Sequence, residues 1–251
     1  MSSELDYLFN PRSIAVVGLS SDPDKVTGMK WVTSMQEMGF KGALYPVSSS
    51  FNEINGLKVY SSLTDIPDEV DLVIGCVPAR YAPQLVEDCV TKKVKFLQFF
   101  TAGFSETGDV DGVVLEQKIT EIAGRGNLRI VGPNCMGVYS PRHCISWRSD
   151  FPTESGPVAV ISQSGMNAVK MVNTGKVRGV RFSNLISYGN AVDLNEVDFL
   201  NYFAADSESK VIVVYIEGVK NAPQFLDALR NAAITKPVIV LKGGSGIAAT
   251  P

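Results

Sequence analysis

Short apolar runs alternate with longer segments of helical periodicity along most of the chain. Several runs are continuously apolar, as at residues 14–17 and 211–214, which is typical of parallel strands covered by helices on both faces. The alternation predicts an α/β fold with parallel sheets built from βαβ units. Nine strands are expected, at residues 13–18, 43–47, 71–77, 94–100, 128–132, 157–162, 180–187, 211–217 and 237–242.

The segment 138–157 interrupts this pattern with three prolines, a glycine and scattered charges. Such a segment is typical of a domain junction. We therefore expect two domains, residues 1–140 with five strands and residues 150–251 with four. The last strand leads into a glycine-rich loop, and the sequence stops at Pro251. We expect the second domain to be incomplete at its C-terminal end.

Composition narrows the classes of protein that need to be considered. The 251 residues include 45% hydrophobic and 20% charged residues, which is ordinary for a globular chain. With 23 Lys and Arg against 26 Asp and Glu, no basic excess suggests a nucleic-acid partner. The longest uncharged stretch, 155–169, is too short and polar for a membrane span. The first ten residues carry no basic or apolar signal region, so a cytoplasmic location is expected.

Four cysteines and one histidine make a metal site improbable by composition, because the cysteines are irregularly spaced and form no Cys-x-x-Cys motif. No metal ligand is therefore assigned. Reduced, buried thiols are favoured over a catalytic cysteine, since free cysteine packs as a small hydrophobe. The single histidine, His143, lies at the domain junction and is interpreted as structural or surface-exposed.

Ligands of open parallel sheets bind beyond the carboxyl ends of the strands, so the loops that follow the strands are expected to hold the binding residues. The loop 18–28 follows the first strand and opens a helix, a position whose free N–H groups and helix dipole attract anions. The dinucleotide fingerprint Gly-x-Gly-x-x-Gly is missing, because Ser20 and Pro23 replace its second and third glycines. An NAD-dependent Rossmann oxidoreductase is therefore disfavoured and stays an alternative.

The end of the second strand gives a second difference between this chain and NAD-binding proteins. NAD-binding proteins place an acidic residue there, on the ribose hydroxyls, whereas this chain has Tyr45, Pro46, Val47 and three serines. A neutral, hydroxyl-rich loop suits a ribose that carries a phosphate, as in coenzyme A, with Lys25 supplying a compensating charge. A solvated turn explains the same residues equally well, so both interpretations stay open from this loop alone.

Two further features lie at strand ends in the second half. Ser162, Gln163, Ser164 and Gly165 end a strand and start a helix, where hydroxyls and backbone amides either bind an anion or only cap the helix. Glu217 follows a buried strand, and such a carboxylate either orients a histidine or cation or is simply solvated.

Together these segments resemble the family of nucleoside-diphosphate-forming acyl-CoA synthetases, which includes ADP-forming acetyl-CoA synthetase and the α subunit of succinyl-CoA synthetase. The resemblance runs over nearly the whole chain, and five motifs in the family's order carry it: residues 8–18, 102–106, 132–137, 162–165 and 215–218. It implies a CoA-binding Rossmann-like domain followed by a flavodoxin-like ligase domain. It also implies an acid-thiol ligase that interconverts an acid, CoA and ATP with acyl-CoA, ADP and phosphate, through an acyl phosphate and a phosphohistidine.

The resemblance also implies roles for individual residues. Asn134 and Cys135 are expected near the CoA thiol and the acyl phosphate. The resemblance implies a catalytic role for Asn134 and for Glu217, which would hold the phosphorylated histidine in place. The helix start that would receive this histidine is formed by Ser162, Ser164 and Gly165. The residues expected to bind CoA, besides Cys135, are Gly18, Ser20, Ser21, Lys25, Pro46, Val47, Val77, Pro78, Gly103 and Phe104.

Two departures from the family pattern carry consequences. Ser48, Ser49 and Ser50 replace an Asn-Pro-Lys type of sequence beside the adenosine. The Ser-His-Thr-Gly motif of the phosphohistidine should follow Lys242, Gly243 and Gly244, but the sequence stops before it. We expect the chain to be inactive alone and to work with an ATP-grasp domain or β subunit that holds ATP or ADP with Mg²⁺, in an oligomer. An inactive, stand-alone CoA-binding regulator is the other alternative.

Overall fold

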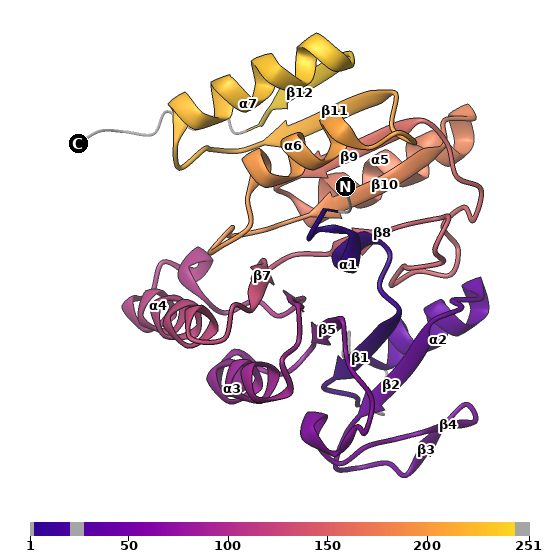
Figure 1. Ribbon diagram of the computed structural model, residues 1–251, viewed down its shortest axis with the longest axis vertical. Helices are drawn as coiled ribbons and strands as arrows, with labels where there is room; N and C mark the ends of the chain where they lie inside the picture. The colour runs from indigo at the N-terminus through magenta and orange to yellow at the C-terminus, as the bar shows by residue number, and fades with distance from the viewer. Residues whose placement is uncertain (1–2, 21–27, 244–251) are drawn as a thin grey trace.

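The computed structural model describes residues 3–20 and 28–243 and contains two five-stranded sheets (Figure 1). The first sheet has the order β2-β1-β5-β6-β7, and every pairing in it is parallel. Its strands are β1 (Ser13–Val17), β2 (Ala43–Val47), β5 (Leu72–Gly75), β6 (Phe96–Phe99) and β7 (Arg129–Val131). All five lie where the apolar runs predicted strands.

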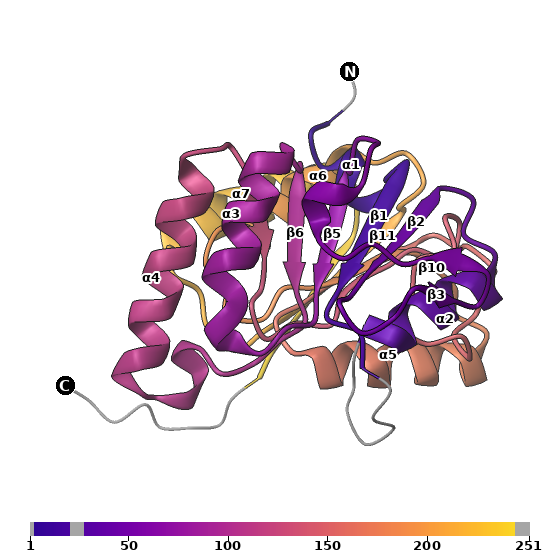
Figure 2. The same ribbon diagram turned by 90° about the horizontal axis from the view of Figure 1, so that it is seen from below.

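Helices cover both faces of the first sheet, as its apolar strands require. Ala15, Val73 and Leu97 face a core formed with α3 (Ala82–Lys92) and α4 (Val110–Gly124), two helices that lie side by side in Figure 2. The alternate residues Ile14 and Leu72 face the opposite core, which includes α2 (Gly28–Met38). The short helix α1 (Asp6–Phe9) precedes β1.

The second sheet has the order β12-β11-β9-β10-β8. Its strands are β8 (Gly137–Tyr139), β9 (Val158–Ser162), β10 (Phe182–Ser187), β11 (Val211–Ile216) and β12 (Val238–Lys242). Helix α5 (Gly165–Arg178) packs on Val160, Phe182 and Leu185 at one face. Helices α6 (Glu196–Ala205) and α7 (Ala222–Thr235) pack on Ile161, Ile212 and Val214 at the other. The α/β fold expected from the sequence is confirmed.

One strand departs from the expectation of purely parallel sheets. Strand β8 runs antiparallel to β10, with Leu185 opposite Tyr139, and it lies in the region taken as the end of the first domain. The predicted ranges 1–140 and 150–251 stay a prediction, but the second sheet begins at Gly137. Gly137 has φ +75°, and a Cβ there would lie 1.8 Å from a side-chain carbon of Gln98. A glycine is therefore required where β8 crosses the buried Gln98, whose Oε1 accepts the Val138 N–H at 3.0 Å.

A small hairpin was also not predicted. Strands β3 (Glu53–Ile54) and β4 (Leu57–Lys58) pair antiparallel around Asn55 and Gly56. Both turn residues have positive φ, 49° and 79°, as a type I′ turn requires. Two-residue strands leave no apolar run, but the Asn-Gly pair was a signal for the hairpin.

The two sheets share one continuous hydrophobic core. The cluster that contains Ile14 and Trp31 of the first half also contains Phe199 and Phe203 of α6. Phe9 of α1 stacks on Tyr202 of the same helix, with ring centroids 4.8 Å apart. No helix in residues 3–20 and 28–243 is long and apolar enough to cross a membrane.

Backbone hydrogen bonds also join the sheets along β7. The segment that follows β10 runs beside β7, where Val192 N–H donates to Gly132 C=O at 3.0 Å and Leu194 N–H donates to Ile130 C=O at 3.1 Å. Asp193 between them accepts from Arg129 Nε at 3.0 Å and Nη2 at 2.9 Å. The carboxyl ends of both sheets are thereby held next to each other.

Candidate active site between the two sheets

The loop after β1 packs directly against the loop after β5, at Gly18 and Cys76. Gly18 has φ +99°, and a Cβ there would lie 2.6 Å from the carbonyl carbon of Cys76. Any other residue would collide with this backbone, so the glycine permits the close approach of the two loops. Ser20 lies in the same loop and is half-buried. Ser21 and Lys25, two of the predicted CoA-binding residues, lie outside the described residues.

Other predicted CoA-binding residues lie at neighbouring strand ends. Pro46 and Val47 end the edge strand β2 and are buried, which is a position where proline is tolerated because the outer side of an edge strand needs no ladder donor. Val77 and Pro78 follow β5, where Val77 C=O accepts a hydrogen bond from the Thr101 hydroxyl at 2.6 Å. These residues form the carboxyl edge of the first sheet, apart from the cavity described below.

The loop after β6 is held by a carboxylate. Glu106 Oε1 accepts from the N–H groups of Gly103 at 2.6 Å and Phe104 at 3.2 Å. Gly103 is exposed, whereas the Phe104 ring is fully buried against Phe99 at 6.0 Å between centroids. The Phe104 side chain therefore supports the loop from the core, and the expected contact of Phe104 with CoA stays a prediction.

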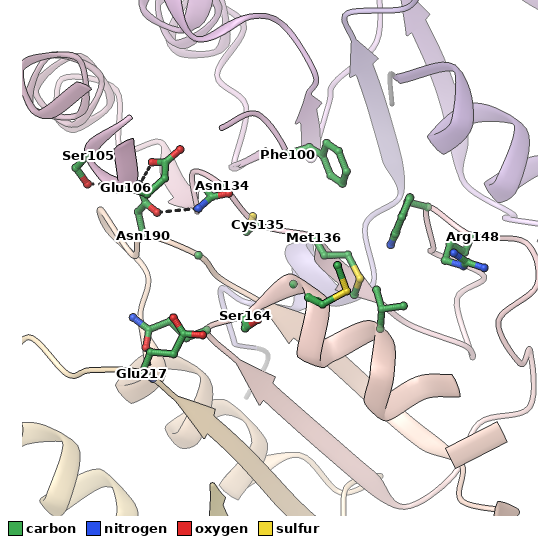
Figure 3. A pocket seen from close by; sticks show the side chains of 16 residues that line it. Phe100, Ser105, Glu106, Asn134, Cys135, Met136, Arg148, Ser164, Asn190 and Glu217 are labelled. Atoms are coloured by element: carbon green, nitrogen blue, oxygen red, sulfur yellow. Dashed lines mark hydrogen bonds between the residues drawn. The ribbon is translucent and has the colours of Figure 1, made fainter. Parts of the chain in front are cut away.

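Asn190 of the second half bridges two carboxylates of the first. Its Nδ2 donates to Glu106 Oε2 at 2.6 Å (Figure 3). The same Nδ2 donates to Glu116 Oε1 at 2.6 Å, and Glu116 also accepts from the Ser105 hydroxyl at 2.8 Å. Partial burial alone raises the pKa of Glu106, but the hydrogen bonds from Asn190 and the Gly103 backbone outweigh it, so the pKa is lowered. The ionised carboxylate thus holds this loop against the second half.

The loop after β7 brings Asn134 and Cys135 to the junction. Asn134 has φ +56° and is exposed, and its Nδ2 lies 3.4 Å from Asn190 Oδ1. The Cys135 thiol is buried and donates to Phe99 C=O at 3.3 Å. Burial raises the pKa of Cys135 well above the ordinary value for cysteine. A thiol that stays protonated is a poor nucleophile, which agrees with the structural interpretation of the cysteines.

The turn from β9 into α5 presents a helix amino terminus to the same junction. The buried Ser162 hydroxyl donates to Ser164 C=O at 2.7 Å and stabilises the turn. Ser164 is the N-cap, and its Oγ accepts from Asn167 N–H at 3.3 Å. Gly165 begins the helix, and a Cβ there would lie 3.5 Å from Met136. The free N–H groups and the dipole of this terminus favour an anion.

Glu217 lies at the end of β11, close to this turn. Gln163 Oε1 accepts from the N–H groups of Glu217 at 2.7 Å and Gly218 at 3.0 Å, which fixes the backbone. The Glu217 carboxylate is exposed and accepts from the Tyr215 hydroxyl at 3.3 Å. The carboxylate is therefore held in place yet accessible to a further donor.

These elements enclose a cavity of about 750 Å³ between the two sheets. It brings together five predicted site residues, namely Asn134, Cys135, Ser164, Gly165 and Glu217. Among the described predicted residues, the buried Ser162 and those at the edge of the first sheet do not line it. Sequence reasoning missed several of its lining residues, including Phe100, Glu106, Trp147, Arg148, Gln163 and Asn190. Glu106 and Gln163 stood within quoted motifs, and Asn190 follows a strand end, so position alone was a signal for these three.

Comparison with known families agrees with this arrangement. Residues 12–141 match the family described as "CoA binding domain", and residues 155–250 match the "Succinyl-CoA ligase like flavodoxin domain". The chain is 37% identical over 245 residues to "Acetate--CoA ligase [ADP-forming] I subunit alpha" of Pyrococcus furiosus. The chain belongs to the NDP-forming acyl-CoA synthetase family. Its Rossmann-like CoA-binding domain and flavodoxin-like domain are those of this family, as the sequence predicted.

Solved structures of this family superpose closely. The dinucleotide forming Acetyl-coenzyme A synthetase 1 of Ca. Korarchaeum cryptofilum, in complex with phosphate and ADP, has a TM-score of 0.89 and 35% identity, covering 96% of this chain and 52% of that one. A crystal structure from Pyrococcus horikoshii has the same TM-score at 39% identity and covers 96% and 55%. The Pyrococcus furiosus relative is covered over 96% of this chain and 53% of its own length. The chain thus spans about half the length of these members of the NDP-forming acyl-CoA synthetase family.

Proposed function

We propose that this chain is the CoA-binding and phosphoryl-handling part of an ADP-forming acyl-CoA synthetase, an acid-thiol ligase. The reaction interconverts a carboxylic acid, CoA and ATP with acyl-CoA, ADP and phosphate. One observation carries the proposal: the loop with Asn134 and Cys135 and the helix start at Ser164 and Gly165 line the same cavity. A thiol and an acyl phosphate can therefore meet there.

The proposed chemical step is attack of the CoA thiolate on the carbonyl carbon of an acyl phosphate. The new sulfur–carbon bond forms as the carbon–oxygen bond breaks, and inorganic phosphate leaves. The free N–H groups at the start of α5 stabilise the negative charge of the phosphoryl group, and the Asn134 amide is available to the carbonyl oxygen. Cys135 does not act as a nucleophile here, because its thiol stays protonated.

Glu217 is proposed to orient the imidazole of a phosphorylated histidine supplied from outside the described residues. Its exposed carboxylate, with its backbone fixed by Gln163, is suited to accept the second ring N–H of such a histidine. His143 has no part in this step, because it lines a different pocket, with Arg142 and Glu208. The remaining predicted CoA contacts among the described residues extend the proposal along the edge of the first sheet, at Gly18, Ser20, Pro46, Val47, Val77, Pro78, Gly103 and Phe104.

The complete enzyme needs further parts. ATP or ADP with Mg²⁺ is assigned to an ATP-grasp domain or β subunit, as the name "subunit alpha" of the Pyrococcus furiosus relative suggests. The small carboxylic acid and the oligomeric assembly belong to that enzyme. The cytoplasmic location is proposed with it, because Cys76, Cys89, Cys135 and Cys144 are all free thiols, as in reducing compartments.

Calorimetric titration with CoA tests the first requirement of the proposal. Saturable binding is expected, weaker for 3′-dephospho-CoA and absent for NAD, which serves as the control for an oxidoreductase. Binding of NAD in place of CoA would overturn the proposal. CoA binding without thioester formation by the complete enzyme, from any acid, would leave a CoA-binding regulator.

A further inference from the structure

Asn190 lies where three elements of the first half meet the second half. It follows β10, whereas Glu106 follows β6, Asn134 follows β7 and Glu116 lies in α4. Figure 3 shows the Asn190 side chain close to both Glu106 and Asn134 at one side of the cavity. Asn190 therefore contacts the loop that carries Gly103 and the loop that carries Asn134.

The backbone leaves Asn190 little freedom of position. Its N–H donates to Pro133 C=O at 3.0 Å. The preceding Gly189 has φ +54°, and a Cβ there would lie 2.1 Å from the Pro133 carbonyl oxygen and 2.4 Å from that of Asn134. Any other residue at this position would collide with both carbonyl groups. The loop after β10 is therefore packed tightly onto the loop after β7.

Two carboxylates determine the orientation of the Asn190 amide. Its Nδ2 donates to Glu106 Oε2 and to Glu116 Oε1, both at 2.6 Å. An amide oxygen in the same place would face two carboxylate oxygens without a proton between them, because an ionised carboxylate only accepts. The NH₂ group is thereby fixed toward the carboxylates, and Asn190 Oδ1 points away from them.

The outward oxygen of Asn190 in turn selects the orientation of the Asn134 amide. Asn190 Oδ1 accepts from Asn134 Nδ2 at 3.4 Å, which is the single hydrogen bond of the Asn134 side chain within residues 3–20 and 28–243. A bond of this length adds little stability, but it selects the nitrogen over the oxygen. The second N–H of Asn134 then remains for a ligand in the cavity.

We propose that Asn190 is a positioning residue for the acyl-transfer step. It relays the orientation set by Glu106 and Glu116 to Asn134, so that Asn134 presents an N–H group to the carbonyl oxygen of the acyl phosphate. The inference rests on the proposed ligase function and adds a residue to the same site. A donor held at this oxygen stabilises the negative charge that develops there as the thiolate attacks. Asn190 itself touches neither reacting group.

Asn190→Leu tests the relay, because leucine has a similar size but neither donates nor accepts. In the complete enzyme, with any further domain or subunit that belongs to it, kcat for thioester formation should fall about 10- to 100-fold. The acid is whichever of acetate, isobutyrate, phenylacetate and succinate the wild type uses fastest. The calorimetric Kd for CoA should stay within about threefold, since Glu106 keeps its bonds to Gly103 and Phe104. Asn231→Leu, exposed on α7 and outside the cavity, is the matched control.

An exchange of donor and acceptor separates the relay from simple packing. Asn190→Asp places a third carboxylate beside Glu106 and Glu116, and it should lower kcat at least as far as Asn190→Leu. Adding Glu106→Gln supplies a new donor: the amide oxygen can still accept from Gly103 and Phe104, while the NH₂ group donates to the aspartate. The double variant should regain about tenfold in kcat over Asn190→Asp. No recovery would overturn the relay.

A neutron structure of the wild-type protein measures the amide orientation without any turnover, because deuterium atoms are visible where X-rays do not show hydrogens. Deuterium on Asn134 Nδ2 should point at Asn190 Oδ1, and both deuterium atoms on Asn190 Nδ2 should point at the carboxylates. The opposite orientation of either amide would overturn the proposal.

The outcomes also separate this proposal from the ligase function. An unchanged kcat in Asn190→Leu, with an active wild type, overturns the positioning role and leaves the ligase function standing. Weaker CoA binding and a lower urea midpoint at unchanged kcat would show that Asn190 only holds the two halves together. Failure of the wild type to form a thioester from any of the four acids, with CoA bound, counts against the ligase function, and the positioning role falls with it.

Discussion

At the scale of single residues, two carboxylates in the same cavity have different surroundings and different roles. Glu106 accepts from two backbone N–H groups and from Asn190, so its hydrogen-bonding capacity is used within the chain. Glu217 has a fixed backbone but an exposed carboxylate, whose single hydrogen bond within residues 3–20 and 28–243 comes from the Tyr215 hydroxyl at 3.3 Å. Glu106 therefore holds a loop, whereas Glu217 is available to a reacting partner.

Replacing Glu217 by Gln should impair the chemistry more than the binding of CoA. Loss of the acceptor that orients a histidine typically costs a factor of about 10 to 100, whereas CoA affinity should stay within about twofold. Steady-state turnover and calorimetry on the complete enzyme measure the two effects. Glu121→Gln, an exposed acid on α4, is the matched control, and equal losses in both variants would contradict the role.

The buried thiol of Cys135 should resist alkylation in the folded protein. Its raised pKa keeps it protonated near neutral pH, and its side chain is only 4% exposed. With iodoacetamide at pH 8, mass spectrometry should find Cys144, which is partly exposed, modified before Cys135. Rapid modification of Cys135 under native conditions would show that the thiol is reactive after all.

At the scale of elements, the start of α5 combines a cap with a binding surface. Ser164→Ala removes the cap and should reduce the free energy of unfolding by about 1 kcal/mol. Ser164→Asp keeps a capping oxygen and should retain stability, but its negative charge repels a phosphoryl group. Urea unfolding and turnover together check this prediction: stability should be lost in the first variant and activity most strongly in the second. Full activity of Ser164→Asp would mean that the terminus only caps.

An ion pair between Arg12 and Asp71 joins the starts of β1 and β5, and Asp71 should titrate in acid. Burial alone raises the pKa of Asp71, but hydrogen bonds and the charge of Arg12 outweigh it and lower the pKa. Arg12 Nε donates at 2.9 Å and Nη2 at 2.8 Å. Because the folded pKa is lowered, this stabilisation is complete above the ordinary aspartate pKa of about 4 and is lost as pH falls below it.

Asp71→Asn should therefore lower the free energy of unfolding at pH 7 by about 1 to 3 kcal/mol. The same variant should lose less stability than the wild type between pH 5 and pH 2. Urea titrations across this range measure both. Parallel curves for the two proteins would show that Asp71 does not titrate with folding.

The elements were largely predictable, and the contacts between them were not. Continuous apolar runs revealed strands such as β1 and β11 because burial on both faces demands them. Strand β8 has only three residues, and it is held by a hydrogen bond to the buried Gln98 of β6. No local sequence pattern therefore predicts it. Asn190 lies 84 residues from Glu106 along the chain, and Trp147 meets Phe100 only after folding. The neighbours Trp147 and Phe100 in the cavity lining could therefore be recognised only in three dimensions.

At the scale of the whole molecule, the shared core predicts a single cooperative unfolding transition. Trp31 lies in the core cluster that joins the two halves, and Trp147, which lines the cavity, packs against the same cluster. Tryptophan fluorescence and far-ultraviolet circular dichroism should therefore give coincident urea curves. CoA, which is proposed to bind mainly the first half, should raise the midpoint of both curves equally. Two separated transitions would contradict the prediction.

The backbone hydrogen bonds along β7 also affect how substrates and products enter and leave the cavity. Rotation of one sheet away from the other would break the hydrogen bonds of Val192 and Leu194 and the paired contacts of Asp193 with Arg129. Opening by a hinge between the halves would require all of these contacts to break, so we expect substrates and products to pass through the mouth of the cavity without rotation of the sheets. Exchange rates should then depend on the size of the acyl group and on whatever approaches that mouth from outside.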